Sequence, residues 1–245
     1  QVDAADEELW LINTRFSCLC TLHPDFSFVP QWRPRFISGL SPQDRCHLNG
    51  LSLVDGRPKF ATALGGTDAP QGWRPAKADG GVLIDIESDE VLVAGLSMPH
   101  SPRWYDGRLW LLESGGGSLG TVDLATGKYE PVCRLDGFTR GLDFCGPFAF
   151  VGISQVRESA VFSGIPITER LDERICGMSV VDLRTGSEVA FVRFQDAVQE
   201  VFAVQVLPHR YPELLLPDDE LVENTYALPD AWLSQVSWMD DSANP

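Results

Sequence analysis

The sequence has 245 residues, of which 44% are hydrophobic and 22% are charged, with 22 glycines and 17 prolines. This turn-rich composition is typical of a folded globular protein and excludes a disordered chain. The net charge of −16 disfavours nucleic acid and anionic membranes as partners, because like charges repel. No apolar run is long enough to cross a bilayer.

Short strands separated by turns are predicted from the N-terminus onward. Residues 9–12 (Leu-Trp-Leu-Ile) form the first apolar strand, and an inner strand is expected before it at residues 2–5. The segments 49–63 and 100–114 each contain two strands that flank an Asp-Gly pair, which is the strongest short-range signal for a β-hairpin. A third hairpin at 140–152 has a turn one residue shorter.

The turns of these hairpins recur in phase. When they are superimposed, Asn49, His100 and Arg140 occupy the same position at the start of the inner strand. The strand–turn–strand segments 81–93, 118–132 and 178–192 supply the third and fourth strands of each unit, and residues 202–208 resemble a further partial copy. The repeat lies near the period of about 40–50 residues that β-propellers show.

We therefore predict an all-β fold, a β-propeller of four-stranded blades over residues 1–212, followed by an acidic C-terminal arm or tail at 213–245. A β-sandwich is the alternative, but it would not require the turns to recur in phase. About four to five blades are fewer than circular closure usually takes. We therefore expect the propeller to be N-terminally incomplete, with the missing part absent from this sequence or supplied by a second chain.

Four segments carry a resemblance to a known family: NTRFSCLCTL at 13–22, RCHLNGL at 45–51, LSMPHSPRW at 96–104 and FTRGLDF at 138–144. Together they resemble an uncharacterised bacterial family of propeller-like proteins, over residues 9–208. The resemblance implies a propeller whose members have a longer N-terminus with a His-containing inner strand, and it implies no activity. More distantly, the blades resemble six-bladed lactonase and senescence-marker propellers, which hold a divalent cation with Glu, Asn and Asp. This chain offers His and Arg instead, so Ca²⁺ is disfavoured.

The six cysteines are sparse and lack the spacing of a disulfide scaffold. We expect reduced, mostly buried thiols and a cytoplasmic protein, since no secretory signal is apparent. Cys18, Cys20 and His23 could in principle bind a metal, but no second ligand pair follows at zinc-site spacing, and buried strand cysteines are favoured.

Inner strands line the axis of a propeller, so residues far apart in the sequence are expected to converge there. The candidate site residues that share this placement are His47, Asn49, His100, Ser101, Arg103, Arg140 and Glu200. Period-two alternation predicts that His47 and Asn49 share one face, as do Ser101 and Arg103. Arg157 and Glu158, in the longest insertion, could reach the mouth of the channel, although a solvated ion pair is favoured.

Two chemistries fit this set. His47 and His100 with Asn49 could bind Zn²⁺ or another transition metal. Alternatively, His47 or His100 could act as a general base beside Arg140, which would hold an anion. A simpler explanation is that these side chains only satisfy strand ends and solvate a channel.

The leading functional hypothesis is a propeller with a His/Asn/Arg-lined axial pocket that binds a metal or a small anionic or polar molecule; as an enzyme it would be a metal-dependent hydrolase or isomerase. The rival is a non-catalytic module that binds a protein or peptide partner, and a third possibility is a scaffold without a ligand. No nucleophile elbow, phosphate loop or dinucleotide fingerprint is present.

Overall fold

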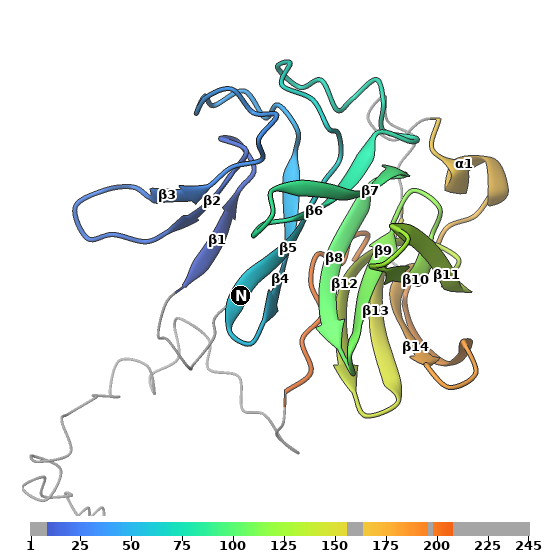
Figure 1. Ribbon diagram of the computed structural model, residues 1–245. Coiled ribbons are helices and arrows are strands. Elements are labelled where there is room, and N and C mark those ends of the chain that lie inside the picture. Colours follow the sequence, from blue (N-terminus) through green and yellow to red (C-terminus); the bar gives the residue numbers. More distant parts are fainter. Residues whose placement is uncertain (1–8, 156–163, 196–197, 208–245) are drawn as a thin grey trace, which may run out of the picture. The chain divides into compact units, whose positions relative to one another are not determined.

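The computed structural model describes residues 9–155, 164–195 and 198–207. Its contacts divide the chain into a unit of residues 1–206 and a second unit of residues 207–245. The first unit is built almost entirely from antiparallel strands (Figure 1). The domain boundary after residue 212 stays a prediction.

Four sheets follow one another along the chain, and each strand pairs with its neighbour in sequence. The first sheet has three strands: β1 (Trp10–Asn13), β2 (Cys18–Thr21) and β3 (Val29–Trp32). The second sheet has four strands: β4 (Leu48–Val54), β5 (Arg57–Ala63), β6 (Gly81–Asp85) and β7 (Glu90–Leu96). The third comprises β8 (Pro99–Tyr105), β9 (Arg108–Glu113), β10 (Ser118–Asp123) and β11 (Lys128–Arg134). The fourth comprises β12 (Phe138–Cys145), β13 (Phe148–Ser154), β14 (Cys176–Asp182) and β15 (Ser187–Phe194). This arrangement confirms the predicted propeller-like fold of four-stranded blades.

The hairpin turns explain why the inner strands form where the sequence predicts them. Asp55 and Gly56 have φ values of 49° and 75°, and Asp106 and Gly107 have 50° and 70°. Two successive residues with positive φ define a type I′ turn, whose twist matches that of the flanking strands. Asp and Gly tolerate this conformation better than other residues, so the two hairpins are encoded locally.

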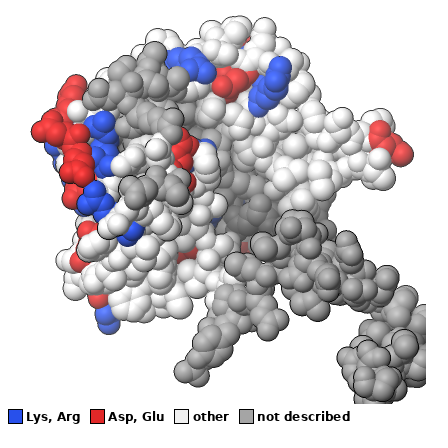
Figure 2. Space-filling view, turned by 180° about the vertical axis from the view of Figure 1, so that it is seen from behind, with Lys and Arg blue, Asp and Glu red and all other residues white. Residues whose placement is uncertain are grey.

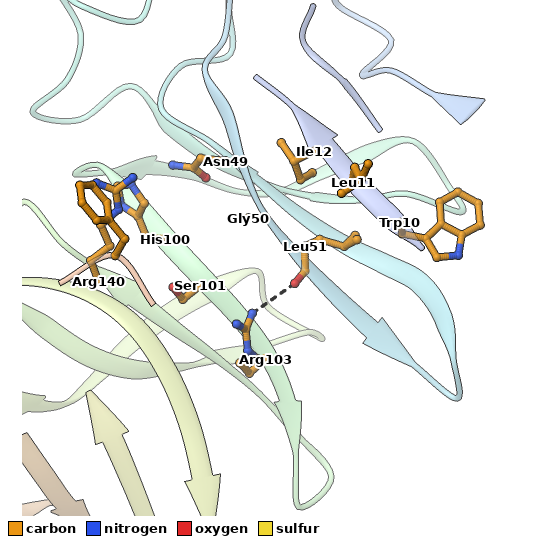
Figure 3. A pocket seen from close by; sticks show the side chains of 11 residues that line it. Trp10, Leu11, Ile12, Asn49, Gly50, Leu51, His100, Ser101, Arg103 and Arg140 are labelled. Carbon is orange, nitrogen blue, oxygen red and sulfur yellow. Dashed lines mark hydrogen bonds between the residues drawn. The ribbon is translucent and has the colours of Figure 1, made fainter. Parts of the chain in front are cut away.

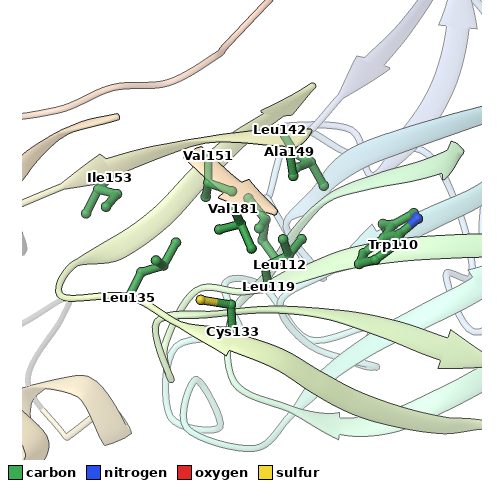
Figure 4. Close-up of a cluster of buried hydrophobic side chains, with 10 residues drawn as sticks. All are labelled: Trp110, Leu112, Leu119, Cys133, Leu135, Leu142, Ala149, Val151, Ile153 and Val181. Carbon is green, nitrogen blue, oxygen red and sulfur yellow. The ribbon is translucent and has the colours of Figure 1, made fainter. Parts of the chain in front are cut away.

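Separate apolar cores lie between consecutive sheets. In β9, Leu109 and Leu111 pack in a cluster with residues of the second sheet, whereas Trp110 and Leu112 pack in a cluster with residues of the fourth (Figure 4). Successive side chains of a strand point to opposite faces, so the continuous apolar run of β9 serves both cores. A third cluster joins Ile12 and Trp32 of the first sheet to the second sheet. Face-to-face packing of this kind extends through all four sheets.

Two elements differ from the sequence-based predictions. Residues 202–207 form no strand, so the predicted partial blade is wrong over the part of it that the structure describes. The long insertion contains a short helix, α1 (Pro166–Arg170), which begins at a proline, and buries Ile165 and Ile167. The expected inner strand at residues 2–5 lies outside the described residues.

All six cysteines are unpaired and five of them are buried, which confirms the predicted burial, and the reduced state of the thiols and the cytoplasmic location stay predictions. Burial raises the pKa of Cys18 and of Cys46 to about 11 each, so these thiols are protonated and unreactive at neutral pH. Within the described ranges, no helix has the length and apolarity of a membrane span. Figure 2 shows one face of the protein, on which Lys and Arg lie beside Asp and Glu instead of gathering into a patch of one sign.

Candidate functional site

The inner strands of three sheets bulge at the same place. In β4 the pairing with β5 shifts between Leu48 and Gly50, which leaves Asn49 as the extra residue. The register of β8 shifts between His100 and Arg103, and that of β12 shifts between Thr139 and Leu142. A bulge redirects the side chains it contains. The aligned positions therefore lie at or next to these bulges: Asn49 and Arg140 lie within the shifted segments, and His100 is the last regularly paired residue before one of them.

Side chains in the bulges hold neighbouring inner strands together. Nδ2 of Asn49 donates to the carbonyl of Pro99 over 3.0 Å, and Oδ1 of Asn49 accepts from the Thr62 hydroxyl over 2.7 Å. Oγ of Ser101 accepts a hydrogen bond from the backbone N–H of Gly141 over 3.1 Å. The amide of Asn49 is thus engaged at both ends, which fits a structural role better than metal coordination.

Arg103 also links inner strands. Its Nε donates to the carbonyl of Leu142 over 3.1 Å, and its Nη1 donates to the carbonyl of Leu51 over 3.3 Å. Burial lowers the pKa of Arg103, and the charge of Asp143 partly offsets this effect. The guanidinium of Arg103 therefore contacts β4 and β12 from its place on β8.

These strands enclose a pocket of about 300 Å³ (Figure 3). Its lining comes from β1, β4, β8, β12 and residue 202, and comprises Trp10, Leu11, Ile12, Asn49, Gly50, Leu51, His100, Ser101, Arg103, Arg140 and Phe202. The apolar side chains of β1 lie on one side of the pocket, and His100 and Arg140 lie on the other (Figure 3). Among the described residues, the lining includes two arginines and no Asp or Glu.

His100 is buried in the pocket wall and has a defined tautomer. Its Nδ1 lies 2.9 Å from the carbonyl of Met98 and 2.9 Å from Oγ of Ser114. A carbonyl only accepts, and the Ser114 hydroxyl donates to the carbonyl of Thr139, so Nδ1 must carry the hydrogen. Burial and the adjacent charge of Arg140 lower the pKa of His100 to about 3. His100 is therefore neutral at physiological pH, with an unprotonated Nε2 that has no hydrogen-bond partner among the described residues.

Arg140 is half-buried, and its guanidinium carbon lies 4.5 Å from the ring centroid of Phe202. Within the described part of the chain, the Arg140 side chain makes no hydrogen bond and no ion pair. Burial lowers the pKa of Arg140, and the charge of Glu200 acts in the opposite direction. Arg140 thus remains a partly desolvated cation whose hydrogen-bond donors are free.

The structure does not place His47 in this pocket. His47 precedes β4 with a φ of 51°, and its Nδ1 lies 2.9 Å from Oδ1 of Asp44. Its ring packs against Trp73, with 4.5 Å between the centroids. His47 lies before β4 and Asn49 lies in its bulge, while Leu48 between them is buried in the core, and the shared face expected for His47 and Asn49 stays a prediction.

Three other predicted residues lie apart from the pocket lining or beyond the described chain. Glu200 is exposed and does not line the pocket. Arg157 and Glu158 lie outside the described residues, so their roles stay predictions. Across residues 9–155, 164–195 and 198–207, no group of three or more His, Cys, Asp or Glu could hold a metal ion.

Sequence reasoning missed the apolar part of the lining. Trp10, Leu11 and Ile12 were expected to be an ordinary blade strand, and nothing in their pattern distinguishes a pocket wall from a core. Phe202 is the first residue of the predicted partial repeat at 202–208, the position that Arg140 occupies in its own repeat. This equivalence was the sequence signal that could have placed Phe202 at the pocket.

Comparisons with known proteins identify a family and several solved structures of low similarity. A family model described as Domain of unknown function (DUF4915) matches residues 1–215. No curated protein matches the chain. Among solved structures, the computationally designed protein Ika8 has a TM-score of 0.41 and 14% identity, over 79% of this chain and 48% of that chain.

Two further solved structures are similar to the chain. The computationally designed Ika4 protein has a TM-score of 0.38 and 16% identity, over 70% of this chain and 84% of that chain. Hydrazine synthase of Kuenenia stuttgartiensis has a TM-score of 0.48 and 8% identity, over 77% of this chain and 46% of that chain. The chain thus spans about half the length of Ika8 and of the hydrazine synthase chain.

Proposed function

The chain belongs to this family of unknown function, and we propose that its pocket binds a small anionic molecule through Arg140. One observation carries the proposal: among the described residues, the Arg140 side chain makes no hydrogen bond or ion pair, and the described lining of the pocket holds no carboxylate. Glu200 acts on the charge of Arg140 without forming an ion pair with it, so a bound anion would supply the close partner that stabilises a desolvated cation.

The composition of the chain makes this arrangement notable. The sequence has 35 acidic residues and only 19 Lys and Arg, yet two arginines and no acid line the pocket. The guanidinium offers a planar set of donors that matches carboxylate and phosphate oxygens in a bidentate manner. The contact with Phe202 stabilises the cation in part and orients it, without using its in-plane donors.

An anion fits better than a metal cation. Arg103 and Arg140 give the pocket a positive potential, and the Asn49 amide is already bonded at both ends. Zinc coordination by His47, His100 and Asn49 stays a prediction, which elemental analysis of untagged protein would test.

Binding also fits better than acid–base catalysis. A general base works best when its pKa lies near the operating pH. The pKa of His100 is lowered to about 3, so the free protein holds this imidazole as a weak base. We therefore propose a binding protein for a small molecule, with the hydrolase or isomerase hypothesis as the less favoured alternative. A protein partner would need about 1,000 Å² of interface, whereas a pocket of about 300 Å³ suits a small ligand.

Isothermal titration calorimetry with phenylacetate and with inorganic phosphate tests the proposal. Arg140→Ala should weaken the binding of the preferred anion by about 10- to 100-fold, as expected for a charged hydrogen-bonding pair. Arg140→Lys keeps the charge but loses the bidentate fork, so its affinity for the anion should fall between those of the wild type and Arg140→Ala. Arg108→Ala is the matched control, because Arg108 is exposed at the start of β9 and lies outside the pocket. Anion binding that is equal in wild type and Arg140→Ala would overturn the proposal, as would the absence of binding at millimolar concentrations.

A further inference from the structure

Most polar groups of the pocket already have partners within the protein. Both ends of the Asn49 amide, Oγ of Ser101 and two nitrogens of Arg103 are hydrogen-bonded to neighbouring strands. Among the described lining residues, this leaves the Arg140 guanidinium as a donor group without any hydrogen bond and Nε2 of His100 as an acceptor without a donor. The hydroxyl hydrogen of Ser101 and Nη2 of Arg103 remain as further donors.

The acceptor character of Nε2 follows from geometry. Nδ1 carries the ring hydrogen, because the Met98 carbonyl 2.9 Å away can only accept it. The ring is 6% exposed and is held by Met98 and Ser114 on one edge and by an edge-on contact with Phe138 at 5.6 Å between centroids. His100 therefore cannot turn freely to offer Nδ1, and the pocket contains a fixed acceptor near a fixed cation.

Resting on the proposed function, we infer that the ligand is a carboxylate that also bears a hydroxyl group. Arg140 binds the carboxylate, and the hydroxyl donates its hydrogen to Nε2 of His100. A plain carboxylate would leave Nε2 desolvated without a donor, and a buried acceptor left in this state weakens binding. A hydroxyl satisfies the acceptor without adding charge.

An ammonium group is the competing donor, and electrostatics disfavour it. A protonated amine at Nε2 would place a second positive charge beside Arg140, in a pocket whose described lining also contains Arg103 and no Asp or Glu. Burial is the main cause of the lowered pKa of His100, and the charge of Arg140 lowers this pKa further, so a positive charge at this position is disfavoured. A hydroxy acid is therefore favoured over an amino acid.

The remaining wall of the pocket suits an apolar substituent. Trp10, Leu11 and Ile12 lie across the pocket from His100 and Arg140 (Figure 3). A ligand whose polar groups contact Arg140 and His100 would direct its apolar part toward these side chains. An aromatic hydroxy acid would place its carboxylate at Arg140, its hydroxyl at His100 and its ring against the apolar side chains of β1.

Three matched probes, mandelate, phenylacetate and phenylglycine, separate these possibilities, because all three share a phenyl ring and a carboxylate. Mandelate also bears a hydroxyl group and phenylglycine an ammonium group, whereas phenylacetate bears no additional donor. Each mandelate enantiomer is titrated separately by calorimetry against the full chain. We expect the better enantiomer to bind about 5- to 10-fold more tightly than phenylacetate, which is the range for one net hydrogen bond. Phenylglycine should bind more weakly than mandelate.

His100→Phe keeps a ring of similar volume and removes the acceptor, so mandelate and phenylacetate should bind this variant equally. The wild-type comparison needs no substitution, so it stands even if the variant fails to fold. A second readout is ¹⁵N NMR of the histidine rings, in which the Nε2 signal of His100 should shift with mandelate and not with phenylacetate.

The two proposals fail in different ways. Equal wild-type affinity for mandelate and phenylacetate, with both weakened by Arg140→Ala, would overturn the hydroxyl inference and leave anion binding intact. Tighter binding of phenylglycine than of mandelate would overturn it in favour of an amino acid. If inorganic phosphate binds and neither carboxylate does, only the hydroxyl inference is overturned. If none of these anions binds, or if their binding is insensitive to Arg140→Ala, both proposals are overturned.

Discussion

Ser101 and Gly141 join two neighbouring sheets at their bulges, because the N–H of Gly141 donates to Oγ of Ser101 over 3.1 Å. Both residues have left-handed backbone conformations, with φ values of 51° and 81°. Ser101 immediately follows His100 and Gly141 immediately follows Arg140. The bond therefore fixes the relative placement of the two residues that we propose to contact the ligand.

Substitution of Ser101 separates the hydrogen bond from the backbone conformation. Ser101→Ala removes the bond and leaves the Gly141 N–H without its acceptor, which should lower the free energy of unfolding by about 1–2 kcal/mol. Ser101→Gly loses the same hydrogen bond but tolerates positive φ, so its free energy of unfolding should fall by roughly 1 kcal/mol less than that of Ser101→Ala. Urea denaturation measures both values. Wild-type stability in both variants would show that the bond does not hold the sheets together.

Gly141 allows the chain after the fourth sheet to approach β12. A Cβ on Gly141 would lie 2.7 Å from the backbone nitrogen of Val204, whereas a Cβ on Gly107 would have no atom within 4 Å. Gly107→Ala should therefore cost only the strain of positive φ, about 1 kcal/mol. Gly141→Ala should cost roughly 1–3 kcal/mol more, because the segment that carries Phe202 must move.

The same pair of variants links packing to the site. Because Phe202 stacks on Arg140, Gly141→Ala should also weaken anion binding, and Gly107→Ala should not. Urea denaturation and calorimetry on both variants provide the test. Equal stability losses in the two variants would contradict the close approach at Gly141.

The hairpins and the alignment of Asn49, His100 and Arg140 were predictable because they depend on local signals. Asp-Gly turns fix the inner strand relative to the next one, and the bulges of β4 and β8 each lie a few residues before these turns. The sequence did not predict which polar groups are already hydrogen-bonded within the protein, since their partners are distant in sequence. Asn49 bonds to Pro99, 50 residues away, and this contact leaves no trace in the local pattern.

The segment after the fourth sheet shows a second limit of sequence reasoning. Its alternating apolar residues suggest a strand, but its N–H groups are bonded to side chains. The N–H of Val201 donates to Oγ of Ser154, and that of Val206 donates to Oδ2 of Asp143. Hydrophobic period alone cannot distinguish a strand from an extended segment that is anchored in this way.

Lysine should not replace Arg103 without a loss of stability, although it retains the positive charge. Its Nε and Nη1 donate to carbonyls on two different strands, and a single ammonium cannot reproduce this planar fork. Arg103→Lys should lower the free energy of unfolding by about 1–3 kcal/mol, because it leaves at least one buried carbonyl unpaired. Arg108→Lys at an exposed site should change stability by less than about 0.5 kcal/mol. Equal urea midpoints for the two variants would show that Arg103 does not bridge the strands.

Buried, neutral His100 should make the protein less stable in mild acid. The pKa of His100 is lowered from 6.5 to about 3, so between these values the unfolded chain binds a proton that the folded chain does not. Stability is therefore lost as the pH falls below 6.5, by about 1.4 kcal/mol per pH unit, which amounts to roughly 2 kcal/mol near pH 5. His100→Gln cannot titrate, so its free energy of unfolding should fall less over the same range, whatever its stability near pH 7. His23→Gln is the control for the loss of one histidine from the chain, because His23 is exposed. Parallel pH profiles for His100→Gln and wild type, measured by urea denaturation, would show that His100 is not held neutral by the fold.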